Sequence, residues 1–278
     1  GETPETVMEV LQTYAQHLPA DPFDLEETDR RLETALRGNP SARAALSAAM
    51  HDLVGKRLGV PVYKLWGLDP AKAPMSTFTI GIDTPERIRM KVQEAAEYPI
   101  LKIKLGSDRD LEILQTIRDA TDRELRVDAN CGWTVKHTIQ MLPVLEEFGV
   151  TVLEQPLVPT DLEGLGIIRM AASIPIIADE SCRVASDIPG LVGQVDGINI
   201  KLAKSGGIRE AIRMAHTARA LGLGVMLGCM VESGIGIAAG CVVAPLCDHV
   251  DLDGNLLLAE DPCPGVAFVD GVQMPSEE

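Results

Sequence analysis

The sequence predicts an α/β fold: a TIM-like (β/α)7β barrel that follows a helical N-terminal region. Three apolar runs end in the carboxylates Asp128, Glu154 and Asp179, which lie 26 and 25 residues apart. That interval is about the length of one strand, loop, helix and loop in a barrel of repeated β/α units. After residue 73 short apolar runs alternate with amphipathic helices, a pattern typical of a parallel sheet. Residues 3–59 show only helical patterns.

The composition limits the classes of function. At 278 residues the chain can bury one large core, and 46% hydrophobic with 3% aromatic residues predict an aliphatic one. The formal net charge of −16 argues against a surface for nucleic acid or anionic membranes, which needs clustered Lys and Arg. The longest apolar run, residues 235–247, is too short to span a membrane, and no secretory signal is visible. We expect a soluble, cytoplasmic protein whose six cysteines are reduced.

The N-terminal region, residues 1–73, is predicted to be built mainly from helices. The first helix begins at Thr3, and residues 25–36 form the second. Ser41 is expected to cap a third helix that ends before Gly59. No residue of this region carries chemistry that the sequence alone reveals.

Residues 74–260 are predicted to form the catalytic barrel. Its expected strands are residues 75–82, 100–105, 125–128, 150–154, 174–179, 197–202, 224–229 and 250–252. Between the fifth and sixth strands only a short, weakly patterned helix is expected, around residues 186–192. The C-terminal segment, residues 261–278, is predicted to form a hairpin that turns at Asp270 and Gly271.

The three spaced carboxylates predict a metal site. Asp128, Glu154 and Asp179 would lie together at the carboxyl ends of adjacent strands, where such barrels keep their chemistry. Converging anions repel unless a cation neutralises them, and an all-oxygen set suits Mg²⁺ rather than zinc. One such residue alone would more often be a helix cap or part of a surface pair. The regular spacing of all three favours the metal.

Two strands carry lysines at positions that suit acid–base chemistry. Lys102 and Lys104 share one face of the second strand, where the three carboxylates would neutralise them. The alternative places both lysines at a solvated rim. Asn199 and Lys201 repeat the spacing on the sixth strand, which is opposite the second in a ring of eight. Lys104 and Lys201 would therefore approach a substrate from its two faces, whereas Lys204 is interpreted as structural or solvated.

The eighth-strand segment carries a third pair at the same spacing, Asp251 and Asp253. Carboxylates that share one side would make a receptor for an ammonium group. The alternative is a surface turn, because Asp253 and Gly254 form a good turn dipeptide, and the local sequence alone slightly favours it.

Several motifs together resemble the enolase superfamily, in its muconate-lactonizing-enzyme subgroup. They are Lys102-Ile103-Lys104, Asp128-Ala129-Asn130, Glu154-Gln155-Pro156, Asp179-Glu180-Ser181 and Asn199-Ile200-Lys201. Within that subgroup, the motifs at residues 228–233 and 251–254 resemble those of dipeptide epimerases of the L-Ala-D/L-Glu type. The resemblance extends from about Thr3 over nearly the whole chain. It implies that residues 1–73 are a partial, mainly helical N-terminal capping domain, and that the C-terminal hairpin, residues 261–278, returns to this cap and completes it.

The resemblance implies an isomerase: an Mg²⁺-dependent dipeptide epimerase. It would invert the α-carbon of the C-terminal residue by two-base 1,1-proton transfer through a metal-stabilised enediolate. The implied metal ligands are Asp128, Glu154 and Asp179. The implied acid and base are Lys104 and Lys201, with Lys102 helping to bind the substrate and to neutralise the enediolate. Asp251 and Asp253 would bind the free α-ammonium group of the dipeptide.

The resemblance also leaves alternatives. Members of the family begin with strands of a capping domain and a mobile loop, whereas this chain starts at a helix, so the N-terminal strands are expected to be absent. The alternative functions are a muconate cycloisomerase or o-succinylbenzoate synthase that uses the same metal site, or a non-catalytic metal- or ligand-binding barrel. The expected partners are a small dipeptide substrate and further copies of the chain in a homo-oligomer, with no nucleic acid and no membrane.

Overall fold

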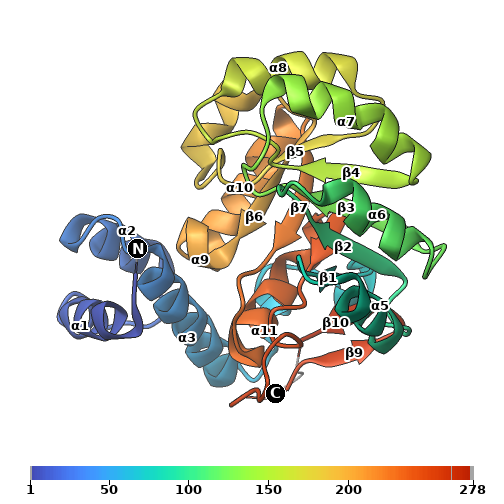
Figure 1. Cartoon of the computed structure of the whole chain (residues 1–278). Helices are drawn as coiled ribbons and strands as arrows, with labels where there is room; N and C mark the ends of the chain where they lie inside the picture. The colour runs from blue at the N-terminus through green and yellow to red at the C-terminus, as the bar shows by residue number, and fades with distance from the viewer. Residues whose placement is uncertain (1, 264, 276–278) are drawn as a thin grey trace.

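Eight parallel strands form a barrel at the centre of the computed structural model, which describes residues 2–263 and 265–275. The strands follow one another around the barrel in chain order (Figure 1). They are β1 (Thr77–Ile80), β2 (Ile100–Lys104), β3 (Glu124–Asp128), β4 (Val150–Glu154), β5 (Ile176–Ala178), β6 (Gly197–Lys201), β7 (Gly224–Gly228) and β8 (His249–Asp251). A bridge between Ser76 and Val250 joins the two end strands, so the ring is nearly closed and the predicted barrel is confirmed.

Helices cover the outside of this barrel (Figure 1). They are α5 (Pro85–Glu94), α6 (Asp110–Arg118), α7 (Val135–Glu147), α8 (Leu162–Ala171), α9 (Leu202–Ser205), α10 (Ile208–Ala220) and α11 (Gly234–Val243), with the 3₁₀ helices η1 (Pro70–Lys72), η2 (Ala185–Leu191) and η3 (Ala244–Leu246). The main core lies between the strands and these helices. A separate small cluster, Val152, Ile177 and Met226, is buried on β4, β5 and β7. The strands are therefore fixed by apolar packing, which gives the polar residues at their carboxyl ends defined positions.

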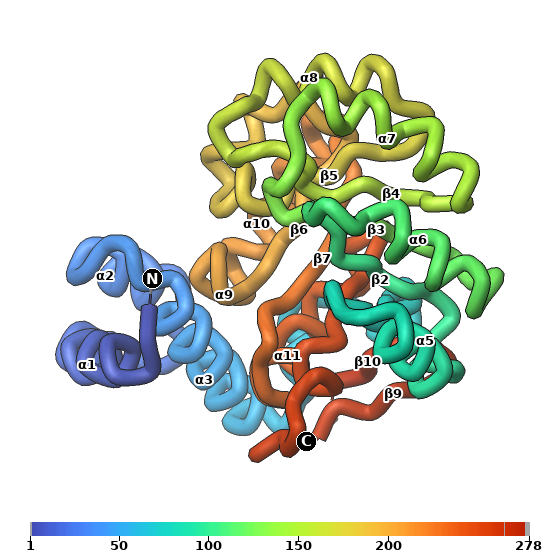
Figure 2. The backbone as a smooth tube through the Cα atoms, viewed as in Figure 1, coloured from blue at the N-terminus to red at the C-terminus, as the bar shows by residue number. Residues whose placement is uncertain are grey.

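The N-terminal helices lie beside the barrel, with α3 closest to it (Figure 2). They are α1 (Pro4–Ala15), α2 (Leu25–Ala35), α3 (Pro40–Leu58) and α4 (Val62–Leu65). The first three share a small core of their own around Tyr14, Leu32 and Ala42. The expected cap at Ser41 is wrong, because α3 begins at Pro40 and the Ser41 hydroxyl donates to the carboxylate of Glu2 at 2.8 Å.

The predicted C-terminal hairpin is confirmed as β9 (Ala267–Val269) and β10 (Val272–Met274), which pair antiparallel, whereas its return to the capping region stays a prediction. It is attached to the start of β1, where the backbone N–H of Ser76 donates to the carbonyl of Gly271 at 2.7 Å. The ring of Phe268 packs on Tyr98, with 4.6 Å between ring centroids. The hairpin therefore belongs structurally to the edge of the barrel where β1 and β8 meet.

Two strands are shorter than expected by three residues or more. β5 begins at Ile176 rather than at residue 174, because Pro175 has no N–H with which to continue the ladder. β1 covers only Thr77–Ile80 of the expected residues 75–82. The weak helix expected between β5 and β6 is the 3₁₀ helix η2. The division into residues 1–73, 74–260 and 261–278 stays a prediction, and within the described part of the chain no helix is both long and apolar enough to cross a membrane.

Candidate active site

Three carboxylates meet at the carboxyl end of the barrel. Asp128 and Glu154 are the last residues of β3 and β4, and Asp179 directly follows β5. One carboxylate oxygen from each lies within 4.8 Å of the other two, and all three side chains are buried. The structure therefore brings together the residues that the sequence spacing singled out.

The loops behind these carboxylates hold them in place. The backbone N–H of Asn130 donates to Asp128 Oδ1 at 2.9 Å, although the Asn130 side chain itself is exposed. The buried Gln155 amide accepts hydrogen bonds from the N–H groups of Asp179 and Ser181, at 2.8 and 3.1 Å. Gln155 adopts a positive φ of 34°, which a residue other than glycine adopts only when its surroundings enforce it. Gln155 thus ties the end of β4 to the residue that carries the third carboxylate.

Lys102 lies at the centre of the acidic group. Its ammonium is 2.7 Å from Asp251, 2.8 Å from Glu154 and 3.1 Å from Asp128, and the side chain is 2% exposed. Burial would lower the pKa of Lys102, but the three carboxylates outweigh burial and raise it well above its ordinary value. The alternative of a solvated rim lysine is therefore wrong for Lys102.

Lys104 and Lys201 each pair with a different carboxylate. Lys104 donates to Asp128 at 2.7 Å and is partly exposed, whereas the buried Lys201 donates to Asp179 at 2.7 Å. They come from β2 and β6, four places apart in the strand order. Gly228 at the end of β7 leaves room for the second lysine, because a Cβ at that position would lie 3.1 Å from Lys201 Cε.

Lys204 also contacts the acidic group, through Asp179, and the sequence alone did not indicate this contact. From α9 it donates to the carbonyl of Asp179 at 2.7 Å and also to its carboxylate. Further contacts of 3.3 Å join it to the carbonyls of Cys182 and Asn199. The interpretation of Lys204 as solvated is wrong, although the alternative of a structural role fits. Its spacing from Lys201, one helical turn after the strand, is the signal that could have indicated it.

Asn199 also belongs to the site, although the sequence alone gave it no role there. Its Nδ2 donates to Glu154 Oε1 at 2.7 Å from the same face of β6 as Lys201. Its Oδ1 is buried without a partner in the described part of the chain. The same holds for Glu180 Oε2, beside Asp179. Such unpaired oxygens next to an acidic cluster suit a site that takes a cation or a hydrogen-bond donor.

Asp251 and Asp253 are both buried, so the alternative of a surface turn is wrong. Asp251 accepts from Lys102 at 2.7 Å and from the hydroxyl of Thr77 at 2.5 Å. Asp253 accepts from the backbone N–H of Thr79 at 2.6 Å. Among the described residues, Asp253 has no ion-pair partner.

Burial and charge give these carboxylates different acidities. Burial raises the pKa of Asp253 to about 7, and the negative charge of Asp251 adds to the effect. Burial also raises the pKa of Glu154 to about 7, with Asp128 adding to it and Lys102 opposing it. Burial would likewise raise the pKa of Asp179, but Lys204 and Lys201 outweigh burial and hold it below its ordinary value. The raised pKa values of Glu154 and Asp253 therefore indicate that the lysines of the site do not fully compensate the negative charge of these two carboxylates.

The donor set fits a divalent cation that prefers oxygen ligands. The cluster Asp128, Glu154 and Asp179 offers three carboxylates, the lysines now neutralise them in part, and no sulfur or imidazole group belongs to it. Hard cations such as Mg²⁺ prefer this chemistry.

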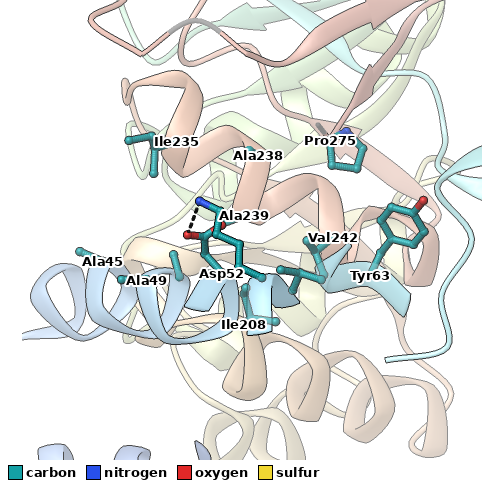
Figure 3. A pocket seen from close by; sticks show the side chains of 13 residues that line it. Ala45, Ala49, Asp52, Tyr63, Ile208, Ile235, Ala238, Ala239, Val242 and Pro275 are labelled. Atoms are coloured by element: carbon teal, nitrogen blue, oxygen red, sulfur yellow. Dashed lines mark hydrogen bonds and ion pairs between the residues drawn. The ribbon is translucent and has the colours of Figure 1, made fainter. Parts of the chain in front are cut away.

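A cavity of about 440 Å³ lies away from this site, between α3 and α11 (Figure 3). It is lined mainly by small apolar side chains such as Ala49, Ala239 and Val242. Asp52 and Lys56 also line it, but they pair with each other at 3.0 Å. None of the lysines or carboxylates of the barrel mouth lines this cavity, so its chemistry does not indicate a reaction.

Comparison with protein families gives two matches. The profile described as "Enolase C-terminal domain-like" matches residues 86–271. The profile described as "Mandelate racemase / muconate lactonizing enzyme, N-terminal domain" matches residues 1–67. Together the two profiles cover most of the chain.

Individual proteins agree with these matches. The chain is 44% identical over 273 residues to an L-Ala-D/L-Glu epimerase of Bacteroides thetaiotaomicron, covering 98% of this chain and 71% of the relative. It is 42% identical to a hydrophobic dipeptide epimerase of Roseobacter litoralis, covering 86% and 72%. A solved structure of a dipeptide epimerase from Enterococcus faecalis, complexed with Mg and L-Leu-L-Tyr, superposes with a TM-score of 0.93 at 33% identity, covering 100% of this chain and 82% of that one.

Proposed function

The chain belongs to the enolase superfamily, in the mandelate racemase and muconate lactonizing enzyme family, and from this premise we propose that it is an Mg²⁺-dependent dipeptide epimerase. The enzyme is an isomerase that inverts the α-carbon of the C-terminal residue of a dipeptide. Its similarity to epimerases and to a complex with Mg and a dipeptide supports both the cofactor and the substrate class.

The observation that carries the substrate class is the uncompensated charge of Asp253. This buried carboxylate lies beside Asp251 and has no cationic partner among the described residues. An isolated buried anion is costly, and a cationic ligand removes that cost. The α-ammonium group of a dipeptide supplies such a cation. The substrates of a cycloisomerase or an o-succinylbenzoate synthase carry none, so this feature favours the epimerase.

The roles of the other residues follow from their positions. Asp128, Glu154 and Asp179 would hold Mg²⁺, which, when bound, would stabilise negative charge on the substrate carboxylate as the α-proton leaves. Lys201 and Lys104 come from strands four places apart, so one lysine would remove the α-proton and the other would deliver a proton to the opposite face. Each must first release the carboxylate that it now contacts.

A small panel of dipeptides tests this proposal. We expect L-Ala-L-Glu or L-Leu-L-Tyr to be epimerised by the protein in the presence of Mg²⁺, and activity to vanish when EDTA removes the metal. The matched control is the N-acetyl derivative of each dipeptide, which lacks the ammonium group and should react at least about 100-fold more slowly. A panel in which no free dipeptide reacts while Mg²⁺ still binds would instead indicate a metal-binding barrel without this activity. A homo-oligomeric assembly and a cytoplasmic location stay predictions.

Replacing Lys204 by methionine is expected to weaken Mg²⁺ binding by about 10- to 100-fold, because Asp179 then loses the cation that fixes its carboxylate and its carbonyl. Isothermal titration of the metal-free protein with Mg²⁺ measures the effect. Lys204→Arg keeps the charge and should recover part of the affinity. Wild-type affinity in Lys204→Met would remove Lys204 from the metal site.

A further inference from the structure

The backbone of Leu252, between Asp251 and Asp253, is held at both of its peptide groups. Its N–H donates to the hydroxyl of Ser76 at 2.9 Å, and its carbonyl accepts from Nε2 of Gln273 at 3.0 Å. The Leu252 side chain packs closely on α11, where a Cβ at Gly240 would lie 3.0 Å from its Cδ2. Ser76, Leu252 and Gln273 are all buried. Leu252 is therefore fixed through its side chain, its donor and its acceptor.

Gln273 comes from an unexpected part of the chain. It lies at the middle of β10 in the C-terminal hairpin, 21 residues after Leu252, and its side chain is 2% exposed. In Figure 1 the hairpin lies beside the barrel, below β1 and α5. The Oε1 atom of Gln273 is buried and has no partner in the described part of the chain.

This unpaired oxygen bears on the role of Gln273. A buried amide that satisfies only one of its two ends costs free energy that an apolar side chain of similar size would not. The amide therefore contributes little to stability as a whole, and its one specific effect is the hydrogen bond to Leu252. Leu252 is bonded to Asp251 on one side and to Asp253 on the other. A hydrogen bond that fixes the Leu252 carbonyl therefore also restrains the backbone from which the two carboxylates project.

We propose that Gln273 is a positioning residue for the ammonium receptor, through which the C-terminal hairpin sets the affinity for the substrate. The inference rests on the proposed function of Asp251 and Asp253. Loss of the hydrogen bond frees the Leu252 carbonyl, and the two carboxylates lose their common orientation. The metal ligands lie at the ends of β3 and β4 and directly after β5, and they keep their contacts with the Asn130 backbone and the Gln155 amide, so we expect Mg²⁺ binding to stay unchanged.

Gln273→Met tests the proposal, because methionine has a similar shape but no donor. We expect a 5- to 20-fold rise in KM for L-Ala-L-Glu or L-Leu-L-Tyr, whichever the wild type epimerises, with kcat within about twofold and an unchanged Mg²⁺ affinity. The melting temperature should change little. A wild-type KM in this variant overturns the proposal.

Phe268→Leu is the control for a general loosening of the hairpin. It weakens the packing on Tyr98 but leaves the bond to Leu252 in place. We expect a lower melting temperature and a wild-type KM. A rise in KM equal to that of Gln273→Met would show that hairpin stability alone accounts for the effect, and would also overturn the proposal. A different result would contradict the proposed function itself: wild-type protein that epimerises neither of the two free dipeptides.

Discussion

Lys201→Ala and Lys104→Ala are each expected to abolish epimerisation, with a fall in kcat of about 1,000-fold or more. Each lysine projects from one side of the barrel, and general acid–base groups typically contribute 10²- to 10⁴-fold. Inversion needs both groups, because a proton removed from one face of the carbon must be replaced at the other. Chiral separation of the two epimers measures the loss.

The same variants should keep a one-sided activity. In D₂O the remaining lysine can still remove the α-proton that faces it and return a deuteron to the same face. Each variant should therefore exchange the α-proton of one epimer only, and the two variants should prefer opposite epimers. The exposed Lys64 on α4 supplies the control, since Lys64→Ala should behave as wild type. Full turnover in either active-site variant would rule out the two-base assignment.

Asp253→Asn is expected to raise KM for a dipeptide with a free amino group by about 100-fold or more. A buried charge pair that loses one partner typically costs 2–5 kcal/mol in binding. Asp253 is a cleaner probe than Asp251, because Asp251 also neutralises Lys102. Steady-state kinetics with Mg²⁺ at saturation measure the change. An unchanged KM would mean that the ammonium group binds elsewhere.

The same substitution should stabilise the protein above neutral pH. Burial raises the pKa of Asp253 from its ordinary value of 3.8 to about 7, so the folded chain holds this proton where the unfolded chain has lost it. The free energy of unfolding therefore falls as pH rises from about 4 to about 7, and the loss persists above that range. Asp253→Asn removes this loss, so we expect it to melt at a higher temperature than wild type at pH 8, with the difference vanishing near pH 4. The exposed Asp122 provides a neutral control as Asp122→Asn. A variant less stable than wild type at pH 8 would contradict the account.

The sequence predicts the barrel and the acidic cluster because both are periodic. Carboxylates at the ends of successive strands recur with the length of the β/α unit, so Asp128, Glu154 and Asp179 could be placed together before any coordinates were known. The alternation of side chains along a strand likewise put Lys102 and Lys104 on one face, and both contact Asp128.

The site contacts that the sequence did not predict join segments that are distant along the chain. Nothing near Gln273 indicates that its amide reaches Leu252, and nothing near Thr77 indicates that its hydroxyl binds Asp251. The Asp253-Gly254 dipeptide suggested a surface turn, but tertiary packing buries it. Of the two alternatives for Lys204, structural or solvated, only the second is wrong: a lysine after a strand is usually solvated, whereas Lys204 donates to the carbonyls of Asp179 and Cys182.

The central claim is that two lysines on opposite sides of a metal-bound dipeptide exchange roles as acid and base. The most direct test is the isotope content of the first product formed in D₂O by the wild-type protein with Mg²⁺, read by mass spectrometry after chiral separation. The account predicts that the inverted epimer carries a solvent deuteron at its α-carbon from the first turnover. An inverted epimer that retains the protium of the original substrate would contradict it.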